Sequence, residues 1–232
     1  MEALLRQGLA AMGLPETAAP ALADYAGRLL RQNEVMNLTA ITDPADVAHL
    51  HLLDSAAVAR HVPLAGKRVV DVGTGAGLPG MVLRILDPDF DLTLLDSLGK
   101  RVDWLASVCR DMGLSRVDSV HARAEEFAGD HRESYDVAVS RAVAQLNVLC
   151  ELMLPLVQVG GVMVAMKSVG SDEEIAAARG AVGQLGGKVR SCVDYTIPGT
   201  DVTHRLVVID KVRPTPPQFP RAFAKIKKQP LK

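Results

Sequence analysis

Cysteine and long apolar runs are scarce in this 232-residue chain, and each scarcity excludes a class of protein. The three cysteines, Cys109, Cys150 and Cys192, include no CxxC pair and form no disulfide framework, so we expect a reducing compartment. No apolar run approaches the roughly 20 residues of a membrane span. The first turns carry Glu2 and Arg6 where a secretory signal would have an apolar stretch. These features predict a cytoplasmic protein that does not bind membranes.

Signatures of several enzyme classes are also missing. The six histidines show no metal-ligand spacing, and we interpret His49 and His51 as surface or structural residues of a helix. The chain has no GxSxG elbow, and neither Tyr135 nor Tyr195 begins the YxxxK pair used by many dehydrogenases. We therefore expect no metal ion, and hydride transfer becomes a secondary hypothesis.

Charge is nearly balanced over the chain but unevenly distributed. Residues 213–232 contain six basic residues and no acid, which leaves 20 basic and 27 acidic residues, a net charge of −7, in residues 1–212. Four prolines between residues 214 and 220 predict an irregular tail that adds nothing to the core. A basic tail on an acidic body predicts a polyanionic partner.

Apolar periodicity divides the chain into a helical N-terminal part and an α/β part. Leu5, Leu9 and Met12 have helical spacing, and Asp43-Pro44 is typical of a helix start. Strand and helix patterns then alternate, as in a doubly wound sheet. The predicted strands are 68–72, 91–96, 116–121, 135–140, 161–167, 188–195 and 203–211, and the predicted helices 78–87, 98–112, 142–155 and 172–185. The short connection 197–201 predicts that the last two strands form a hairpin. We thus predict a helical cap (1–62), an α/β domain (63–212) and a basic proline-rich tail (213–232).

The segment DVGTGAGLPG, residues 71–80, is the strongest indication of a ligand site. Its glycines allow the backbone after the first strand to turn sharply and approach a ligand. Asp96 ends the second strand, nineteen residues after Gly77, where an acid accepts hydrogen bonds from the hydroxyls of an adenosine ribose. Nicotinamide dinucleotides and S-adenosylmethionine both fit this pattern. Negative charge on Asp71, just before the glycines, disfavours a pyrophosphate and suits the cationic S-adenosylmethionine, which we therefore favour. Alternatively, Asp71 only hydrogen-bonds the loop amides, a role that is compatible with the same cofactor.

The fourth strand ends in Ser140-Arg141-Ala142-Val143, where methyltransferases commonly hold the acceptor. The Asp/Asn-Pro-Pro-Tyr tetrapeptide of exocyclic-amine methylation is absent, as is a Pro-Cys pair for covalent attack on a pyrimidine. Cys109 and Cys150 are predicted to be packing residues inside helices. Guanine N7 remains a suitable acceptor, because its in-plane lone pair carries no proton and needs only orientation. We expect no general base.

With these motifs the sequence resembles the bacterial glucose-inhibited division protein B family, the guanine-N7 methyltransferases of small-subunit (16S) ribosomal RNA. The resemblance extends from about residue 30 to the end of the chain and is most specific in the LPG and LLDSLGKR extensions of the two cofactor motifs. The matching segments are residues 37–41, 51–55, 71–80, 94–102, 123–126, 140–142 and 204–209.

The resemblance implies roles for individual residues. The glycine loop would line the methionine end of the cofactor, Asp96 the ribose and Ala124-Glu125 the adenine edge, and Arg141 would lie beside cofactor and acceptor. The implied cofactor-binding residues are Gly73, Gly75, Gly77, Leu78, Asp96, Ala124, Glu125 and Arg141. Basic residues at strand and helix ends, together with the tail, are expected to meet RNA phosphates. These are Lys100, Arg101, Lys167, Arg205, Arg221, Lys225, Lys227 and Lys228.

We therefore predict a class I S-adenosylmethionine-dependent methyltransferase, with a Rossmann-like, mostly parallel seven-stranded sheet whose last strand is antiparallel. The expected partner is 16S ribosomal RNA or the small ribosomal subunit. Two alternatives stay open at this point. One is an NAD(P)-dependent oxidoreductase. The other is a ribosome-assembly factor that binds S-adenosylmethionine without catalysis.

Overall fold

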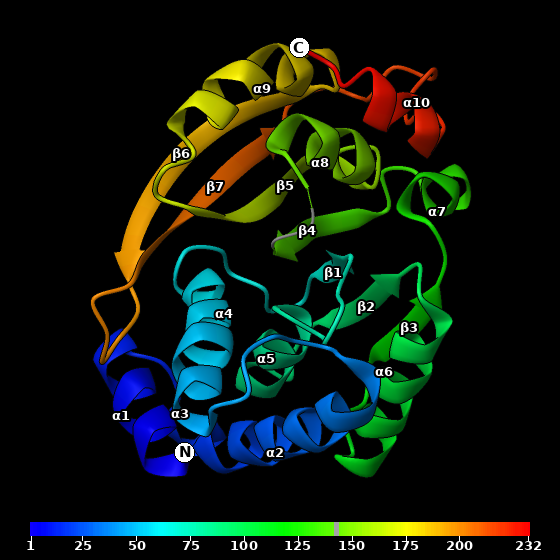
Figure 1. The fold of residues 1–232 in the computed structure, drawn as a ribbon. Coiled ribbons are helices and arrows are strands. Elements are labelled where there is room, and N and C mark those ends of the chain that lie inside the picture. Colours follow the sequence, from blue (N-terminus) through cyan, green and yellow to red (C-terminus); the bar gives the residue numbers. More distant parts are fainter. Residues whose placement is uncertain (142–143) are drawn as a thin grey trace.

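A seven-stranded sheet forms the centre of the computed structural model, which describes residues 1–141 and 144–232 (Figure 1). The strands run in the order β3-β2-β1-β4-β5-β7-β6. They are β1 (Arg68–Val72), β2 (Asp91–Asp96), β3 (Val117–His121), β4 (Tyr135–Arg141), β5 (Val157–Ser168), β6 (Gly187–Thr196) and β7 (Thr203–Lys211). The pairs from β3 to β5 are parallel, whereas β7 is antiparallel to both β5 and β6. The predicted mostly parallel sheet, its antiparallel last strand and the hairpin are confirmed.

Alternate residues of the strands enter two separate apolar cores, because successive side chains of a strand point to opposite faces. Val69 and Val70 of β1 are both fully buried, but Val69 packs with the N-terminal helices and Val70 with the helices of the opposite face. A sheet covered on both faces needs apolar residues at nearly every position of its central strands. This explains the short continuous apolar runs in the sequence.

The N-terminal helices share one face of the sheet with the first two helices of the α/β part (Figure 1). Asp43 Oδ1 accepts hydrogen bonds from the amides of Ala45 and Asp46, at 2.8 and 3.0 Å, so the predicted helix start is correct. The elements are α1 (Glu2–Met12), η1 (Glu16–Ala18), α2 (Ala19–Met36), α3 (Pro44–Asp46), the π-helical η2 (Val47–Leu53), α4 (Asp54–Ala56), η3 (Ala57–Arg60), α5 (Gly80–Leu86) and α6 (Gly99–Asp111).

The opposite face is covered by α7 (Ala124–Asp130), α8 (Leu146–Met153) and α9 (Asp172–Gln184). The sequence did not predict α7, because its seven residues are too few to show a helical period. Of the predicted helix 142–155, Ala142 and Val143 lie outside the described residues. Cys109 and Cys150 are buried, as expected for packing residues. Across the described residues, every helix falls short of the combined length and hydrophobicity that a bilayer-spanning segment requires.

The expectation that the C-terminal tail is irregular and adds nothing to the core was wrong. Residues after Pro220 form α10 (Phe223–Lys228), which lies beside α8 (Figure 1). Ile226 is fully buried, and Phe219 is 8% exposed and packs in the second core. Arg132 donates hydrogen bonds to the carbonyls of Thr215, Pro216 and Phe219. Prolines prevent a helix at residues 214–220, but an irregular backbone still docks when its carbonyls and apolar side chains find partners.

Candidate active site

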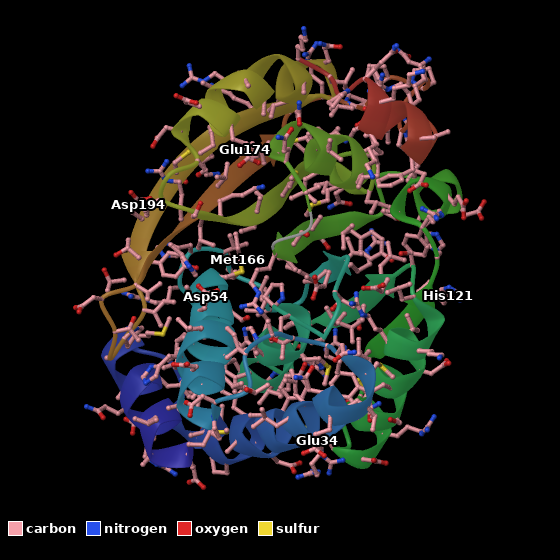
Figure 2. All side chains as sticks on the ribbon, viewed as in Figure 1. Glu34, Asp54, His121, Met166, Glu174 and Asp194 are labelled. Carbon is pink, nitrogen blue, oxygen red and sulfur yellow. The ribbon has the colours of Figure 1, made fainter. Side chains whose placement is uncertain are left out.

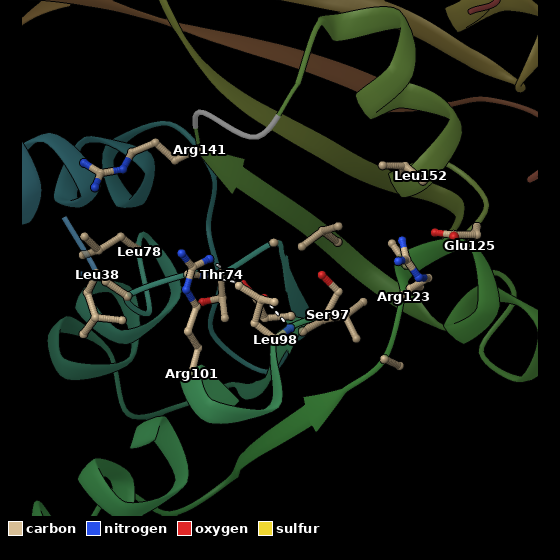
Figure 3. A pocket seen from close by; sticks show the side chains of 18 of the residues that line it. Leu38, Thr74, Leu78, Ser97, Leu98, Arg101, Arg123, Glu125, Arg141 and Leu152 are labelled. Atoms are coloured by element: carbon tan, nitrogen blue, oxygen red, sulfur yellow. Dashed lines mark hydrogen bonds and ion pairs between the residues drawn. The ribbon is translucent and has the colours of Figure 1, made fainter. Parts of the chain in front are cut away.

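A cavity of about 480 Å³ opens at the carboxyl ends of the first four strands. Its wall includes Val72 at the end of β1, Asp96 at the end of β2, Ala122 after β3 and Arg141 at the end of β4. Figure 3 shows Arg141 on one side of the cavity and Arg123 on the other. Open α/β sheets bind ligands at this edge, and the volume suits a small molecule.

The glycine loop between β1 and α5 forms part of the cavity wall. Gly73 and Gly75 line it with φ angles of 69° and 56°, which glycine adopts without a steric cost. A Cβ on Gly75 would meet only the carbonyl oxygen of Gly73, at 3.9 Å, so this backbone faces open space. Leu78 also lines the cavity. The structure thus brings three of the four predicted loop residues to the cavity.

Gly77, the fourth, packs away from the cavity. A Cβ there would lie 2.6 Å from both Met81 Cγ and Tyr25 Oη, so only glycine allows the loop to contact α2 and α5 this closely. The Tyr25 hydroxyl donates a hydrogen bond to the carbonyl of Ala76. Gly77 therefore allows the loop to pack closely against the N-terminal helices, which hold it in place.

Asp71 braces the loop from below and is fully buried. Its Oδ2 accepts hydrogen bonds from the Thr74 hydroxyl at 2.7 Å and from the Gly80 amide at 2.8 Å. Burial raises the pKa of Asp71 to about 6, although these two hydrogen bonds oppose the shift. Within the described residues Oδ1 has no hydrogen-bond partner. The interpretation that Asp71 hydrogen-bonds loop amides is correct for the Gly80 amide. Asp71 thus acts on the loop from beneath and is not among the residues that line the cavity.

Asp96 lines the cavity at the end of β2, and both of its carboxylate oxygens also organise the backbone. Oδ2 accepts the Gly75 amide at 2.8 Å, and Oδ1 accepts the Leu98 amide at 2.9 Å. Arg101 Nη1 lies 3.8 Å from Oδ2. Because a carboxylate has about four lone-pair sites, two remain for hydroxyl donors. The residue therefore connects the glycine loop to the start of α6 and still has capacity to bind a ligand.

Arg141 is held in a fixed position at one end of the cavity. Its Nη1 donates to the carbonyl of Leu50 at 2.9 Å and to Asp54 Oδ2 at 3.2 Å. Its Nη2 donates to His51 Nδ1 at 3.1 Å. A guanidinium with partners on both terminal nitrogens cannot rotate freely, so the N-terminal helical segment determines where Arg141 points.

Asp54 joins this segment to the β6–β7 hairpin (Figure 2). Its side chain is only 2% exposed, and its Oδ1 accepts the Tyr195 hydroxyl at 2.7 Å and His204 Nδ1 at 2.8 Å. Burial alone would raise the pKa of Asp54, but the hydrogen bonds from His204 and Tyr195 and the charge of Arg141 outweigh it and hold the pKa below its ordinary value. The hydrogen bond between His204 and Asp54 also raises the pKa of His204.

His51 lines the cavity and is 8% exposed, so it is a structural residue rather than a surface one. Its Nε2 lies 2.7 Å from the Thr39 hydroxyl, and its Nδ1 accepts from Arg141. Burial, followed by the charge of Arg141, lowers the pKa of His51 to about 4. The imidazole is therefore neutral at pH 7, and both nitrogens already have partners.

The far end of the cavity is formed by residues after β3 and by the C-terminal segment. Arg123, Glu125 and Leu152 of α8 lie at this end (Figure 3). Ala124 also lines the cavity, as does Phe223 of α10, which lies beside Arg123. The guanidinium carbon of Arg123 lies 5.8 Å from the centroid of the Phe223 ring, within cation–π distance. This end thus combines the apolar side chains of Leu152 and Phe223 with the charged Arg123 and Glu125.

The basic residues predicted to meet RNA fall into two groups. Lys167 pairs with Glu174 at 2.7 Å, Arg205 with Asp172 and Asp194, and Arg221 with Glu151. Figure 2 shows Glu174 and Asp194 on the side of the sheet that carries β6. The exposed members are Lys100, Lys225, Lys227 and Lys228, and the half-buried Arg101 lines the cavity.

Comparison with protein families gives one assignment for nearly the whole chain. The model of rRNA small subunit methyltransferase G matches residues 18–199. The ribosomal RNA small subunit methyltransferase G of Alkaliphilus metalliredigens is 44% identical over 234 residues, which cover 99% of this chain and 98% of that protein. This chain belongs to the ribosomal RNA small subunit methyltransferase G family. The protein of the same name from Clostridium botulinum is 41% identical over 91% of this chain and 90% of the relative. The predicted family and enzyme class are confirmed, and the chain is an S-adenosylmethionine-dependent methyltransferase.

Solved structures support the same fold. The Bacillus subtilis YcgJ protein aligns with a TM-score of 0.55 at 12% identity, covering 69% of this chain and 98% of that one. M. jannaschii TYW2 in complex with AdoMet aligns with a TM-score of 0.52 at 12% identity, covering 65% of this chain and 72% of that one. At these identities the likeness concerns the fold alone, and it confirms the predicted class I methyltransferase fold.

Sequence reasoning missed the network around Asp54 and the aromatic wall at Phe223. Asp54 and His204 fell inside segments that matched the family, but nothing local to either residue indicated that they meet. Phe223 belongs to the tail that was expected to remain outside the core. No local periodicity identifies such residues, because their contacts span 87 to 150 positions of the chain.

Proposed function

We propose that this chain transfers a methyl group from S-adenosylmethionine to N7 of one guanine in 16S ribosomal RNA. The observation that carries the proposal is the cavity at the ends of β1, β2 and β4. There, an open glycine backbone, the Asp96 carboxylate and the fixed Arg141 guanidinium line one space.

The residues of the cavity fit S-adenosylmethionine. Asp96 would hold the ribose hydroxyls, and Gly73, Gly75 and Leu78 would line the methionine end. Asp71 lies beneath the loop, and its Oδ1 has no hydrogen-bond partner among the described residues. A nearby cation would be favoured there, since positive charge promotes ionisation of a buried carboxyl with a pKa of about 6. When bound, the cofactor supplies an electrophilic methyl group on its sulfonium.

A dinucleotide fits less well, because Asp71 already binds a backbone amide that a pyrophosphate would need. A pyrophosphate binds the free amides at the start of the helix after β1. Here the Gly80 amide, the first of α5, already donates to Asp71 Oδ2 at 2.8 Å. This contact disfavours the NAD(P)-dependent alternative.

The acceptor chemistry follows from what the side chains at the cavity can do. His51 is neutral and engaged at both nitrogens, so it has no free position from which to remove a proton. Guanine N7 needs no such step, because its lone pair attacks directly. Arg141 uses three of its N–H donors within the protein and has five in total, so the remainder can orient the acceptor base. Proximity and orientation then supply most of the rate.

The proposed macromolecular partner is 16S ribosomal RNA, free or in the small ribosomal subunit, and the proposed place of action is the cytoplasm. Exposed Lys100, Lys225, Lys227 and Lys228 provide positive charge for a phosphate backbone. We also propose that residues 1–62 act as a cap that fixes the glycine loop and Arg141, on an α/β unit of residues 63–212.

The test is methylation by the purified protein with methyl-labelled S-adenosylmethionine, using ribosomal RNA and small subunits as separate substrates. We expect label at one guanine, and chain cleavage at that position after reduction and aniline treatment, which is specific for N7-methylguanine. Label on another atom or on protein would contradict the proposal. Tight cofactor binding with no transfer to either substrate would support the non-catalytic assembly factor instead.

A further inference from the structure

The C-terminal segment supplies a cavity wall that lies beyond the residues matched by the family model. The family model covers residues 18–199, whereas Phe223 belongs to α10 and lines the cavity. We propose that Phe223 packs against the adenine of S-adenosylmethionine, which makes the C-terminal segment part of the cofactor site. This inference rests on the proposed function.

The position of Phe223 along the cavity assigns it to the adenine. Asp96, the proposed ribose ligand, is paired in register with His121, the last residue of β3. In Figure 3, Thr74 of the glycine loop and Arg141 lie on one side of Ser97, the residue after Asp96, and Arg123 lies on the other side. With the methionine end on the glycine loop, the base extends toward Arg123 and Phe223.

The side chains at this end suit a flat, weakly polar ring. Leu98 lines the cavity and is 52% exposed, so its side chain is free to contact a ligand. Phe223 adds an aromatic face, and Arg123 lies against its ring at 5.8 Å. Bases stack on aromatic side chains whatever their hydrogen-bond pattern, so such a wall adds affinity and leaves base selection to the Ala124–Glu125 edge.

Phe223 is held in place before any ligand arrives. Two residues earlier, Arg221 Nε and Nη2 donate to Glu151 at 2.7 and 2.6 Å, and the Arg221 amide also donates to Glu151 Oε1 at 3.0 Å. Glu151 is fully buried on α8, next to the cavity residue Leu152. Three residues after Phe223, Ile226 is also fully buried. Anchors on both sides reduce the conformational freedom that the ring loses on binding, which favours affinity.

The test measures cofactor binding directly by calorimetry on the full-length protein. Two ligands are used: S-adenosylmethionine, and 5′-methylthioadenosine, which keeps the adenosine but lacks the amino-acid end. Phe223→Ala is expected to raise the Kd of both ligands by the same factor, at least about fivefold. Phe223→Trp, which keeps a flat ring, is expected to stay within about twofold of wild type. The matched control is Gln229→Ala, an exposed position of the same segment.

Each outcome decides the inference. Unchanged binding of both ligands by Phe223→Ala, with tight binding by wild type, would refute the inference and leave the proposed function intact. Weaker binding of S-adenosylmethionine alone would place Phe223 at the methionine end and also refute it. Failure of the wild type to bind either ligand would refute the proposed function together with the inference. If Phe223→Ala does not fold, Phe223→Leu fills the volume without a flat face and is expected to weaken both ligands equally.

Discussion

The two ends of the cavity are built in different ways. At one end, Arg141 is fixed by Asp54, His51 and the carbonyl of Leu50, a buried polar network in which each donor has a defined partner. At the other end, Phe223 and Leu152 form an apolar wall, and one buried ion pair, Arg221–Glu151, anchors the C-terminal segment. Polar networks fix orientation, whereas apolar walls supply affinity with little directional preference. The difference suits the proposed reaction, in which a methyl group is aimed at one end and the adenine is held at the other.

The largest effect is expected from breaking the polar end at its centre. Asp54→Ala leaves the Arg141 guanidinium, the His204 ring and the Tyr195 hydroxyl without their shared acceptor. Removing one partner of a buried charge pair costs about 3–5 kcal/mol of the free energy of unfolding. We expect a loss near the upper end of this range, because three donors lose the same acceptor. Urea unfolding measures the loss. Single-turnover methylation should fall as well, because Arg141 loses its only carboxylate partner among the described residues and keeps just the Leu50 carbonyl and His51.

The control for this variant is an exposed acid away from the cavity. Asp103 lies exposed on α6, and Asp103→Ala should change the free energy of unfolding by no more than about 0.5 kcal/mol. A loss for Asp54→Ala as small as that of the control would show that the network does not hold the cap and the hairpin together.

The anchor of the apolar end gives the next largest effect. Arg221→Ala leaves the fully buried Glu151 without its cation, at a cost of about 3 kcal/mol. The C-terminal segment should then undock, so residues 213–232 should become sensitive to protease and to hydrogen exchange. S-adenosylmethionine affinity should fall as in Phe223→Ala, although Arg221 does not line the cavity. Protease resistance equal to that of Lys228→Ala, an exposed position, would count against the anchor.

A smaller effect on stability is expected from acid, which protonates His51 at the polar end of the cavity. The pKa of His51 is lowered from 6.5 to about 4 in the folded protein, so between these values the unfolded chain binds the additional proton. Stability therefore falls as the pH decreases from about 6.5 to 4, by about 2–3 kcal/mol from this residue. His51→Gln removes the titration. Urea unfolding across this range should show a steeper acid loss for the wild type than for the variant, and parallel curves would contradict the pKa assignment.

The sequence predicted those parts of the site that depend on local pattern. The glycine loop follows β1 and Asp96 ends β2, and both positions follow from strand ends and short spacings. The mostly parallel sheet and the hairpin were predictable for the same reason, because alternating apolar patterns and connection lengths restrict the topology.

The parts that the sequence did not reveal depend on distant contacts or on irregular backbone. Asp54 meets Tyr195 and His204 across 141 and 150 positions, and no periodicity reports such a meeting. The docking of the C-terminal segment depends on a single arginine finding Glu151 and on carbonyls finding Arg132. Proline and lysine content describes a solvated tail equally well, so composition misled the prediction there.

The smallest effect concerns the exposed lysines of α10 and refines the use of the C-terminal segment. Deleting the whole segment would remove Arg221 and Phe223 and confuse RNA binding with cofactor binding. Replacing Lys225, Lys227 and Lys228 together by alanine leaves both anchors in place, since all three side chains are exposed. Each phosphate contact contributes roughly 0.7–0.9 to the slope of log K against log salt, so filter binding to ribosomal RNA across a salt series should show a slope flatter by about 2 if these lysines contact the backbone. S-adenosylmethionine affinity should be unchanged, because none of the three lines the cavity. An unchanged slope would show that these lysines do not contact RNA phosphates, whereas weaker cofactor binding would show that the lysines help to dock α10.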